Sequence, residues 1–170
     1  ENTDNISVLV EEDFITSVSP SFGKGAGIRI FKDKRDGFVS TNDLSRKGLI
    51  SSITQAIEML DINTTTIKRF EGLENLRDYS IGKNTWLETI PTVNEIGAKL
   101  LSSTNFLKKE ERVNVRKGSY ARNWQKVIIA SSDGTFAKDI RLHQTVGINV
   151  IALDKQYRSS GSRRFGSSDS

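Results

Sequence analysis

Three glycines at alternate positions are the first residues in this sequence whose spacing could do chemistry. Gly23, Gly25 and Gly27 lie in the stretch FGKGAGIRIF, residues 22–31. A glycine-rich loop binds phosphate when a helix follows it, because the N–H groups at the helix N-terminus then face the anion. Here a strand-like run follows, and no Gly-Lys-Ser/Thr closes the loop. The pattern therefore argues against nucleotide binding and favours close backbone packing.

Metal-binding and nucleophilic residues are scarce. The chain has one histidine, His143, and no cysteine, whereas a zinc site takes three or four ligands of His, Cys or carboxylate type. His143 is expected on a strand, on the face opposite Leu142, as an ordinary surface histidine; a catalytic base is the alternative. Serines are frequent, but no G-x-S-x-G elbow is present. The chain is therefore expected to hold no catalytic constellation.

An alternating stripe of aromatic and basic residues precedes a strand-like run. It consists of Tyr120, Arg122, Trp124 and Lys126. Such a stripe could stack nucleic-acid bases. A strand face covered by a helix is the favoured interpretation, because cross-strand and helix contacts are the commoner role of such residues.

Charge is concentrated at the C-terminal end. The 170 residues carry 25 basic and 21 acidic side chains, a net charge of +4. Residues 155–170 hold four basic residues and one acidic residue, so their charge is +3 and residues 1–154 carry only +1. A nearly neutral body argues against nucleic acid as a partner. No apolar run is long enough to cross a membrane.

The hydrophobic pattern predicts an α+β fold of antiparallel or mixed sheet meanders and two main helices. Strand-like segments at residues 6–40 predict one antiparallel meander, and Gly37 is expected at positive φ in its last turn. The segments are 6–10, 14–21, 26–31 and 38–40.

Two stretches have helical spacing. The first is expected at residues 46–60, with Ser45 as its N-cap. The second is expected at 92–105, where Thr92 and Glu95 form a capping box. Residues 63–91 between them are expected to be a surface excursion.

Strands return after the second helix. Residues 125–154 predict a hairpin whose turn is Asp133-Gly134. The apolar residues of its second strand fall on one face, with Gln144 as an exception: Ile140, Leu142, Val146, Ile148 and Val150. The Ser-rich tail 155–170 has almost nothing to bury, so it is expected to be mobile or to need something outside this chain.

The stretch GAGIRIFKDKRDGFVSTNDLS, residues 25–45, resembles the TldD/PmbA family, whose N-terminal halves carry G-x-G-x-R-V, a short turn and G-[FY]-[AV]-S-T-x-D-L-[ST]. Residues 127–154 resemble the family's strand pair, with Asp133 and Gly134 in its turn, and residues 157–166 resemble its polar basic-glycine segment. The details favour the TldD side and cyanobacterial-type members. The first block matches at Gly25, Gly27, Arg29, Gly37, Phe38, Ser40, Thr41, Asp43, Leu44 and Ser45.

The resemblance implies a role for the chain within a longer protein. Family members, also called modulators of DNA gyrase, are cytoplasmic zinc metallopeptidases that cut unfolded peptides and act with a PmbA/TldE-like partner or by self-association. Their H-E-x-x-x-H motif lies in a C-terminal domain and is absent from these 170 residues. We therefore expect residues 1–154 to be a non-catalytic N-terminal domain with no cofactor and no activity alone. Residues 155–170 would lead toward the catalytic domain, with Arg158, Arg163 and Arg164 as candidate contacts to peptide in a substrate chamber.

Two alternatives remain at this point. One is a stand-alone or metal-free, PmbA-like scaffold or binding module. The other, weaker one is a nucleic-acid-binding module that uses Tyr120, Trp124 and the basic tail.

Overall fold

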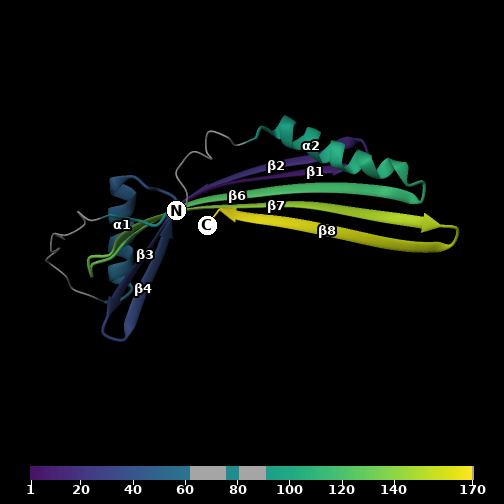
Figure 1. Cartoon of the computed structure of the whole chain (residues 1–170). Helices are drawn as coiled ribbons and strands as arrows, with labels where there is room; N and C mark the ends of the chain where they lie inside the picture. Colours follow the sequence, from purple (N-terminus) through teal and green to yellow (C-terminus); the bar gives the residue numbers. More distant parts are fainter. Residues whose placement is uncertain (62–75, 81–90, 170) are drawn as a thin grey trace. The chain divides into compact units, whose positions relative to one another are not determined.

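The computed structural model describes residues 1–61, 76–80 and 91–169 (Figure 1). It confirms the α+β class and the two main helices. The elements in chain order are β1 (Asn2–Glu11), β2 (Phe14–Lys24), β3 (Ala26–Lys32), β4 (Arg35–Thr41), α1 (Arg46–Glu58), β5 (Arg77–Asp78), α2 (Val93–Asn105), a short 3-10 helix η2 (Phe106–Lys109), β6 (Val113–Ala130), β7 (Phe136–Asp154) and β8 (Tyr157–Asp169).

The predicted N-terminal meander is wrong in its pairing, although its strands exist. Strands β1 and β2 belong to a sheet of order β2-β1-β6-β7-β5, to which β8 adds by pairing with β7. Strands β3 and β4 pair only with each other in the described part of the chain, in an antiparallel register from Ala26↔Thr41 to Lys32↔Arg35. The reason is that α1 packs on β3 and β4 and gives this hairpin its own apolar partner.

The chain divides into two compact units, and β6 and β7 contribute residues to both. The first unit comprises residues 1–2, 23–78 and 127–138, and the second comprises 3–22, 79–126 and 139–170.

In the first unit, α1 begins and packs as its sequence predicts. The Gly48 N–H donates to the Ser45 hydroxyl at 3.1 Å, so Ser45 caps the helix. Ala56 and Leu60 are fully buried. The helix ends at Glu58, close to the predicted residue 60.

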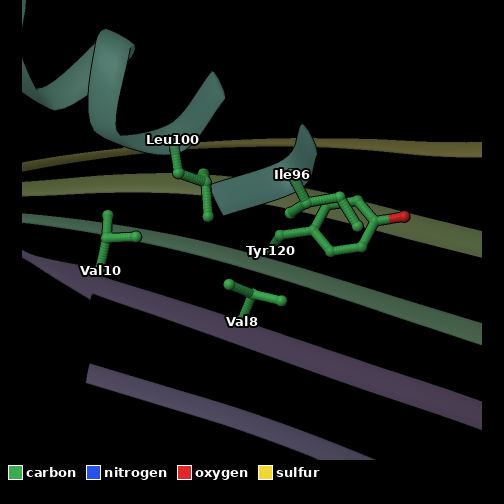
Figure 2. Packing of buried hydrophobic residues seen from close by; sticks show 5 residues of the cluster. All are labelled: Val8, Val10, Ile96, Leu100 and Tyr120. Atoms are coloured by element: carbon green, nitrogen blue, oxygen red, sulfur yellow. The ribbon is translucent and has the colours of Figure 1, made fainter. Parts of the chain in front are cut away.

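In the second unit, α2 covers one face of the long sheet (Figure 1). Its capping box is confirmed: Thr92 Oγ1 accepts from the Glu95 N–H at 3.2 Å, and Glu95 accepts from the Thr92 N–H at 2.7 Å. Burying each large apolar side chain stabilises the fold by roughly 1.5–3 kcal/mol. The core shown in Figure 2 joins β1, α2 and β6 through Val8, Val10, Ile96, Leu100 and Tyr120.

The predicted β6–β7 hairpin is also confirmed. Gly134 is at φ +96°, and the Asp133 carboxylate accepts from the Thr135 N–H at 2.8 Å. Gln144, the exception on the apolar face of β7, accepts a 2.8 Å hydrogen bond from the Tyr120 hydroxyl. Its amide therefore satisfies the one polar atom of the buried tyrosine.

The tail was expected to be mobile or to need something outside this chain, whereas the structure shows a paired strand. Residues Tyr157–Asp169 form β8, which pairs antiparallel with β7 from Asp154↔Tyr157 to Leu142↔Asp169. The side chains of residues 157–168 are exposed, so main-chain hydrogen bonding rather than side-chain burial holds this strand.

The excursion expected at residues 63–91 lies mostly outside the described residues. Within them, β5 pairs in parallel with Ala137 and Lys138 of β7. The Lys138 ammonium group and the Asp78 carboxylate form an ion pair at 3.0 Å beside this short pairing.

Candidate functional site

The glycines of the sequence motif serve the β3–β4 hairpin and its helix. A Cβ on Gly37 would lie 2.3 Å from the Ala56 carbonyl oxygen of α1, so only glycine lets the strand approach the helix this closely. Gly37 is therefore buried in β4 and is not at positive φ, which corrects the prediction; Asp33 takes the left-handed turn position at φ 56°. A Cβ on Gly27 would press on the Phe38 ring at 3.2 Å. No helix N-terminus follows these glycines.

Arg29 and Phe38 lie on this hairpin as well. The Arg29 Nε donates to Asp36 at 2.8 Å across the hairpin, and its guanidinium stacks over the Phe31 ring at 5.0 Å. Both charged groups are substantially exposed, so this pair contributes little to stability. Phe38 is 56% exposed.

The polar half of the motif starts α1. The Asp43 N–H donates to the Thr41 hydroxyl at 3.0 Å, and the Asp43 carboxylate accepts from the Ser45 N–H at 2.9 Å. Hydrogen bonds from Ser45 lower the pKa of the Asp43 carboxyl. A Cβ on Gly48 would lie 2.3 Å from the Asp43 side chain. Asp43 and Gly48 thus pack together at the start of α1. The sequence interpretation overlooked Gly48.

A hollow of about 410 Å³ lies beside this helix start. Ser40, Thr41, Asp43, Lys47 and Gln55 line part of it. The Ser52 hydroxyl on the same wall already donates to the Gly48 carbonyl at 3.0 Å. Thr41, Asp43 and Ser52 are thus engaged in forming the start of the helix.

A buried arginine joins the β1–β2 turn to β6. Arg116 is 6% exposed, and its Nε donates to Glu12 Oε2 at 3.0 Å. In addition, the Glu12 N–H donates to the Arg116 carbonyl, and the Arg116 N–H donates to the Glu12 carboxylate, both at 2.9 Å. This pairing holds Glu12 at φ 53°, a conformation that L-residues adopt at a cost.

The ionisation of Glu12 depends on this arginine. Burial alone would raise the pKa of the Glu12 carboxyl, but the hydrogen bonds and charge of Arg116 outweigh burial and lower the pKa. Sequence reasoning missed Arg116 and Glu12 because 104 residues separate them along the chain.

Tyr120, the first residue of the stripe on β6, is covered by α2, as the favoured interpretation predicted. Tyr120 is 6% exposed within the core, and its burial raises the pKa of the phenol. Tyr120 therefore offers no surface for base stacking. Next to it on the strand, Arg122 donates to Asp4 at 3.3 Å. Arg122 Nε and Trp124 Nε1 are buried and have no hydrogen-bond partner among the described residues.

The three candidate arginines of the tail do not lie together. Residues paired across antiparallel strands point to the same face, and Arg163 pairs with Ile148 whereas Arg164 pairs with Gly147. Ile148 shares its face with Gln144, which contacts Tyr120, so Arg163 lies on the face that α2 covers. Arg164 and Arg158, an even number of residues apart, lie on the opposite face, which we call the open face. His143 is also on that face, exposed on β7 as predicted.

A hollow of about 570 Å³ lies along the open face next to β8. We call it the β8 hollow. Its lining includes Glu11, Lys117, Ser119, Gly147, Ser162 and Arg164. The Lys117 ammonium and Glu11 carboxylate pair at 3.0 Å.

The described residues contain no group of three or more His, Asp or Glu side chains placed to hold a metal ion, so the zinc that the resemblance implies does not fit this part of the chain. None of the described helices is long and apolar enough to cross a membrane.

The fold and motifs together define a class: paired α+β units of the kind found in PmbA/TldD-type proteins. Residues 1–60 match the model of PmbA/TldA metallopeptidase domain 1, and residues 87–170 match that of the PmbA/TldA metallopeptidase central domain. The chain belongs to the PmbA/TldD family, as the resemblance indicated. The boundary expected at residue 154 stays a prediction.

Solved structures share the fold at low sequence identity. A protein called a modulator of DNA gyrase, from Bacteroides thetaiotaomicron, is 19% identical with a TM-score of 0.71 over 98% of this chain. One called a modulator of a DNA gyrase, from Thermotoga maritima, is 17% identical with a TM-score of 0.68 over 97% of it. TldE from Thermococcus kodakarensis is 17% identical with a TM-score of 0.66, also over 97%.

The chain spans 39%, 37% and 38% of these three structures. None of the curated proteins matches it.

Proposed function

We propose that residues 1–170 are the non-catalytic accessory part of a longer metallopeptidase that degrades unfolded peptides, and that they help to form its substrate chamber. The observation that carries the proposal is the double match to domain 1 and the central domain of PmbA/TldA metallopeptidases. In this account zinc, two histidines and a glutamate base belong to a domain outside these residues. The partner is a TldE-like subunit or a second copy of the protein.

The sheet edge at β8 supports a role in handling extended chains. Among the described residues, β8 pairs only with β7, so one side of its main chain carries unpaired N–H and C=O groups. An extended peptide can add to such an edge by main-chain hydrogen bonds, which tolerate many sequences. A peptidase that acts on unfolded chains needs this kind of sequence-tolerant binding.

The experiment is to express the longest reading frame that contains this sequence and to measure its zinc content and its cleavage of an unfolded peptide. The proposal predicts bound zinc, cleavage that a chelator abolishes, and no cleavage by residues 1–170 alone. A full-length protein without zinc and without activity would contradict it and would favour the metal-free scaffold.

A further inference from the structure

We propose that an apolar groove between the end of α2 and strand β8 binds a large apolar side chain of an unfolded peptide, one that has acidic residues on either side of it. This inference rests on the proposed function, because it assumes that the chain handles unfolded peptides. It adds the class of peptide segment that is selected, a phenylalanine or leucine between carboxylates.

The groove lies on the side of the sheet that carries α2, and its volume is about 380 Å³. On the sheet it is lined by Ile148, Val150 and Gly161. On the helical side it is lined by Phe106 and Leu107 of η2. Val150 pairs with Gly161 across β7 and β8, so both lie on the same face as Ile148. We call this feature the α2–β8 groove.

The α2–β8 groove offers mainly apolar surface. Ile148, Val150 and Leu107 are only partly buried, and the Phe106 ring is 68% exposed. The Ser103 hydroxyl, which also lines the groove, already donates to a backbone carbonyl of α2 at 2.8 Å. An apolar side chain placed here therefore removes apolar surface from water without depriving that hydroxyl of its partner.

Gly161 keeps the α2–β8 groove open. A Cβ at this position would lie 3.6 Å from Val150 Cγ2, which is an ordinary contact. Packing among the described residues therefore does not require glycine here, in contrast to Gly37. A larger side chain at residue 161 would point to the α2 side of the sheet and fill part of the groove.

The charges beside the groove match a carboxylate. Among the described residues that line it, Arg163 is the only charged one. Its guanidinium stacks over the Phe165 ring at 5.7 Å and has no carboxylate within ion-pair distance in the described chain. The Lys109 ammonium lies 5.2 Å from the centre of the Phe106 ring, so a second cation lies beside the groove. Two cations next to apolar surface favour an apolar side chain with acidic neighbours.

The size of the groove favours a peptide over a folded partner. Eight described residues line it, whereas a stable protein interface takes roughly 20–30 residues on each side. This space fits one side chain together with its neighbours in the peptide. Binding is therefore expected to be weak, with a Kd on the order of 1 mM.

The test is an NMR titration of the isotope-labelled 170-residue chain with three capped peptides. The Phe-Glu peptide is Ser-Glu-Phe-Glu-Ser; the Phe-Gln peptide has Gln in place of Glu, and the Ser-Glu peptide has Ser in place of Phe. The Phe-Glu peptide should shift the amide signals of Gly161 and Leu107 most. The Phe-Gln peptide should bind about threefold more weakly, and the Ser-Glu peptide should cause no shift.

Two variants of β8 test the space, with the Leu107 signal as the reporter in both. Gly161→Val should weaken binding of the Phe-Glu peptide by about tenfold, because valine occupies the groove. Gly166→Val is the matched control: a Cβ there would also make ordinary contacts at 3.6 Å, but it points to the open face. It should leave binding unchanged. Well-dispersed amide spectra check that both variants fold.

Two further variants test the charge. Arg163→Gln should weaken binding of the Phe-Glu peptide by about threefold and leave that of the Phe-Gln peptide unchanged. Arg158→Gln, on the open face of the same strand, should affect neither. Because Arg163 also lines the β8 hollow, the position of the site is judged from Gly161, which lines the α2–β8 groove and not that hollow.

Four results would overturn the inference. They are no shift of Gly161 with any peptide, equal binding of the Phe-Glu and Ser-Glu peptides, equal effects of Gly161→Val and Gly166→Val, and a Gly161 signal that shifts with protein concentration alone. The last result would mean that a second copy of the chain covers the groove. These readouts need no zinc and no cleavage, so failure of the metallopeptidase proposal would not be mistaken for failure of this one.

Discussion

The β3–β4–α1 region and strand β8 use their polar residues in opposite ways. In the first region, Arg29 pairs with Asp36, and Asp43 accepts from the Ser45 N–H, so the motif residues hold their own backbone in place. In β8, Arg158 and Arg164 have no carboxylate partner among the described residues. A strong sequence motif can thus mark a demanding backbone geometry, while a plain Ser- and Gly-rich segment can form a strand whose charged side chains have no carboxylate partner in the described chain.

The largest expected effect comes from Gly37→Ala. The added Cβ would meet the Ala56 carbonyl oxygen, which is backbone and cannot move aside without shifting α1. We expect a loss of about 3 kcal/mol in the free energy of unfolding, measured by urea denaturation. Gly161→Ala in β8 is the control, because its Cβ would lie at an ordinary 3.6 Å from Val150. Equal stability of the two variants would refute the close-packing role of Gly37.

The next effect comes from Arg116→Met. This change leaves Glu12 without its partner and frees a turn residue held at positive φ. We expect a loss of about 2 kcal/mol, below the range for fully buried pairs because Glu12 is 36% exposed. Arg112→Met removes an exposed pair with Glu110 and should change stability little. If both variants unfold at the same urea concentration, Arg116 is not the turn's anchor.

Acid should weaken the second unit through the same pair. The pKa of Glu12 is lower in the folded state than its usual value of 4.5, so its pairing stabilises the fold above that pH. This contribution is lost as the pH falls through the lower, folded-state pKa. The wild-type unfolding free energy should therefore fall more steeply below pH 4.5 than that of Arg116→Met. Parallel pH profiles would contradict this assignment.

The smallest expected effects come from removing the N-cap hydroxyls of α2 and α1. Thr92→Ala removes the two hydrogen bonds of the Thr92 hydroxyl, which accepts from the Glu95 N–H and donates to the Glu95 carboxylate, and should cost about 1 kcal/mol. Ser45→Ala should cost less, because the Ser45 hydroxyl caps α1 through the one hydrogen bond that it accepts from the Gly48 N–H. Thermal unfolding of the two variants measures the difference. A larger loss for Ser45→Ala would contradict this ranking.

Local signals explain what the sequence predicted well. Both helices and the Asp133-Gly134 turn depend on residues within a few positions of one another, and each was placed nearly correctly. The cover over Tyr120 was the favoured interpretation of the alternating aromatic and basic stripe at residues 120–126. The family resemblance came from the motif at residues 25–45. Its residues shape the β3–β4 hairpin and the start of α1 rather than a binding site.

Long-range pairing explains what the sequence did not predict. The separation of β3 and β4 from β1 and β2 depends on which surface α1 covers, and no local pattern encodes it. Glu12 and Arg116 meet only in the fold. Strand β8 has no β-branched residue, so propensity favoured a mobile tail; its pairing comes from the exposed edge of β7 instead.

Residue-resolved amide hydrogen exchange across β8 tests the central claim, that this segment is a formed edge strand with one side open. The account predicts alternating protection over residues 158–166: N–H groups that face β7 exchange slowly, and those that face outward exchange fast. Uniformly fast exchange would contradict the account and favour a mobile tail.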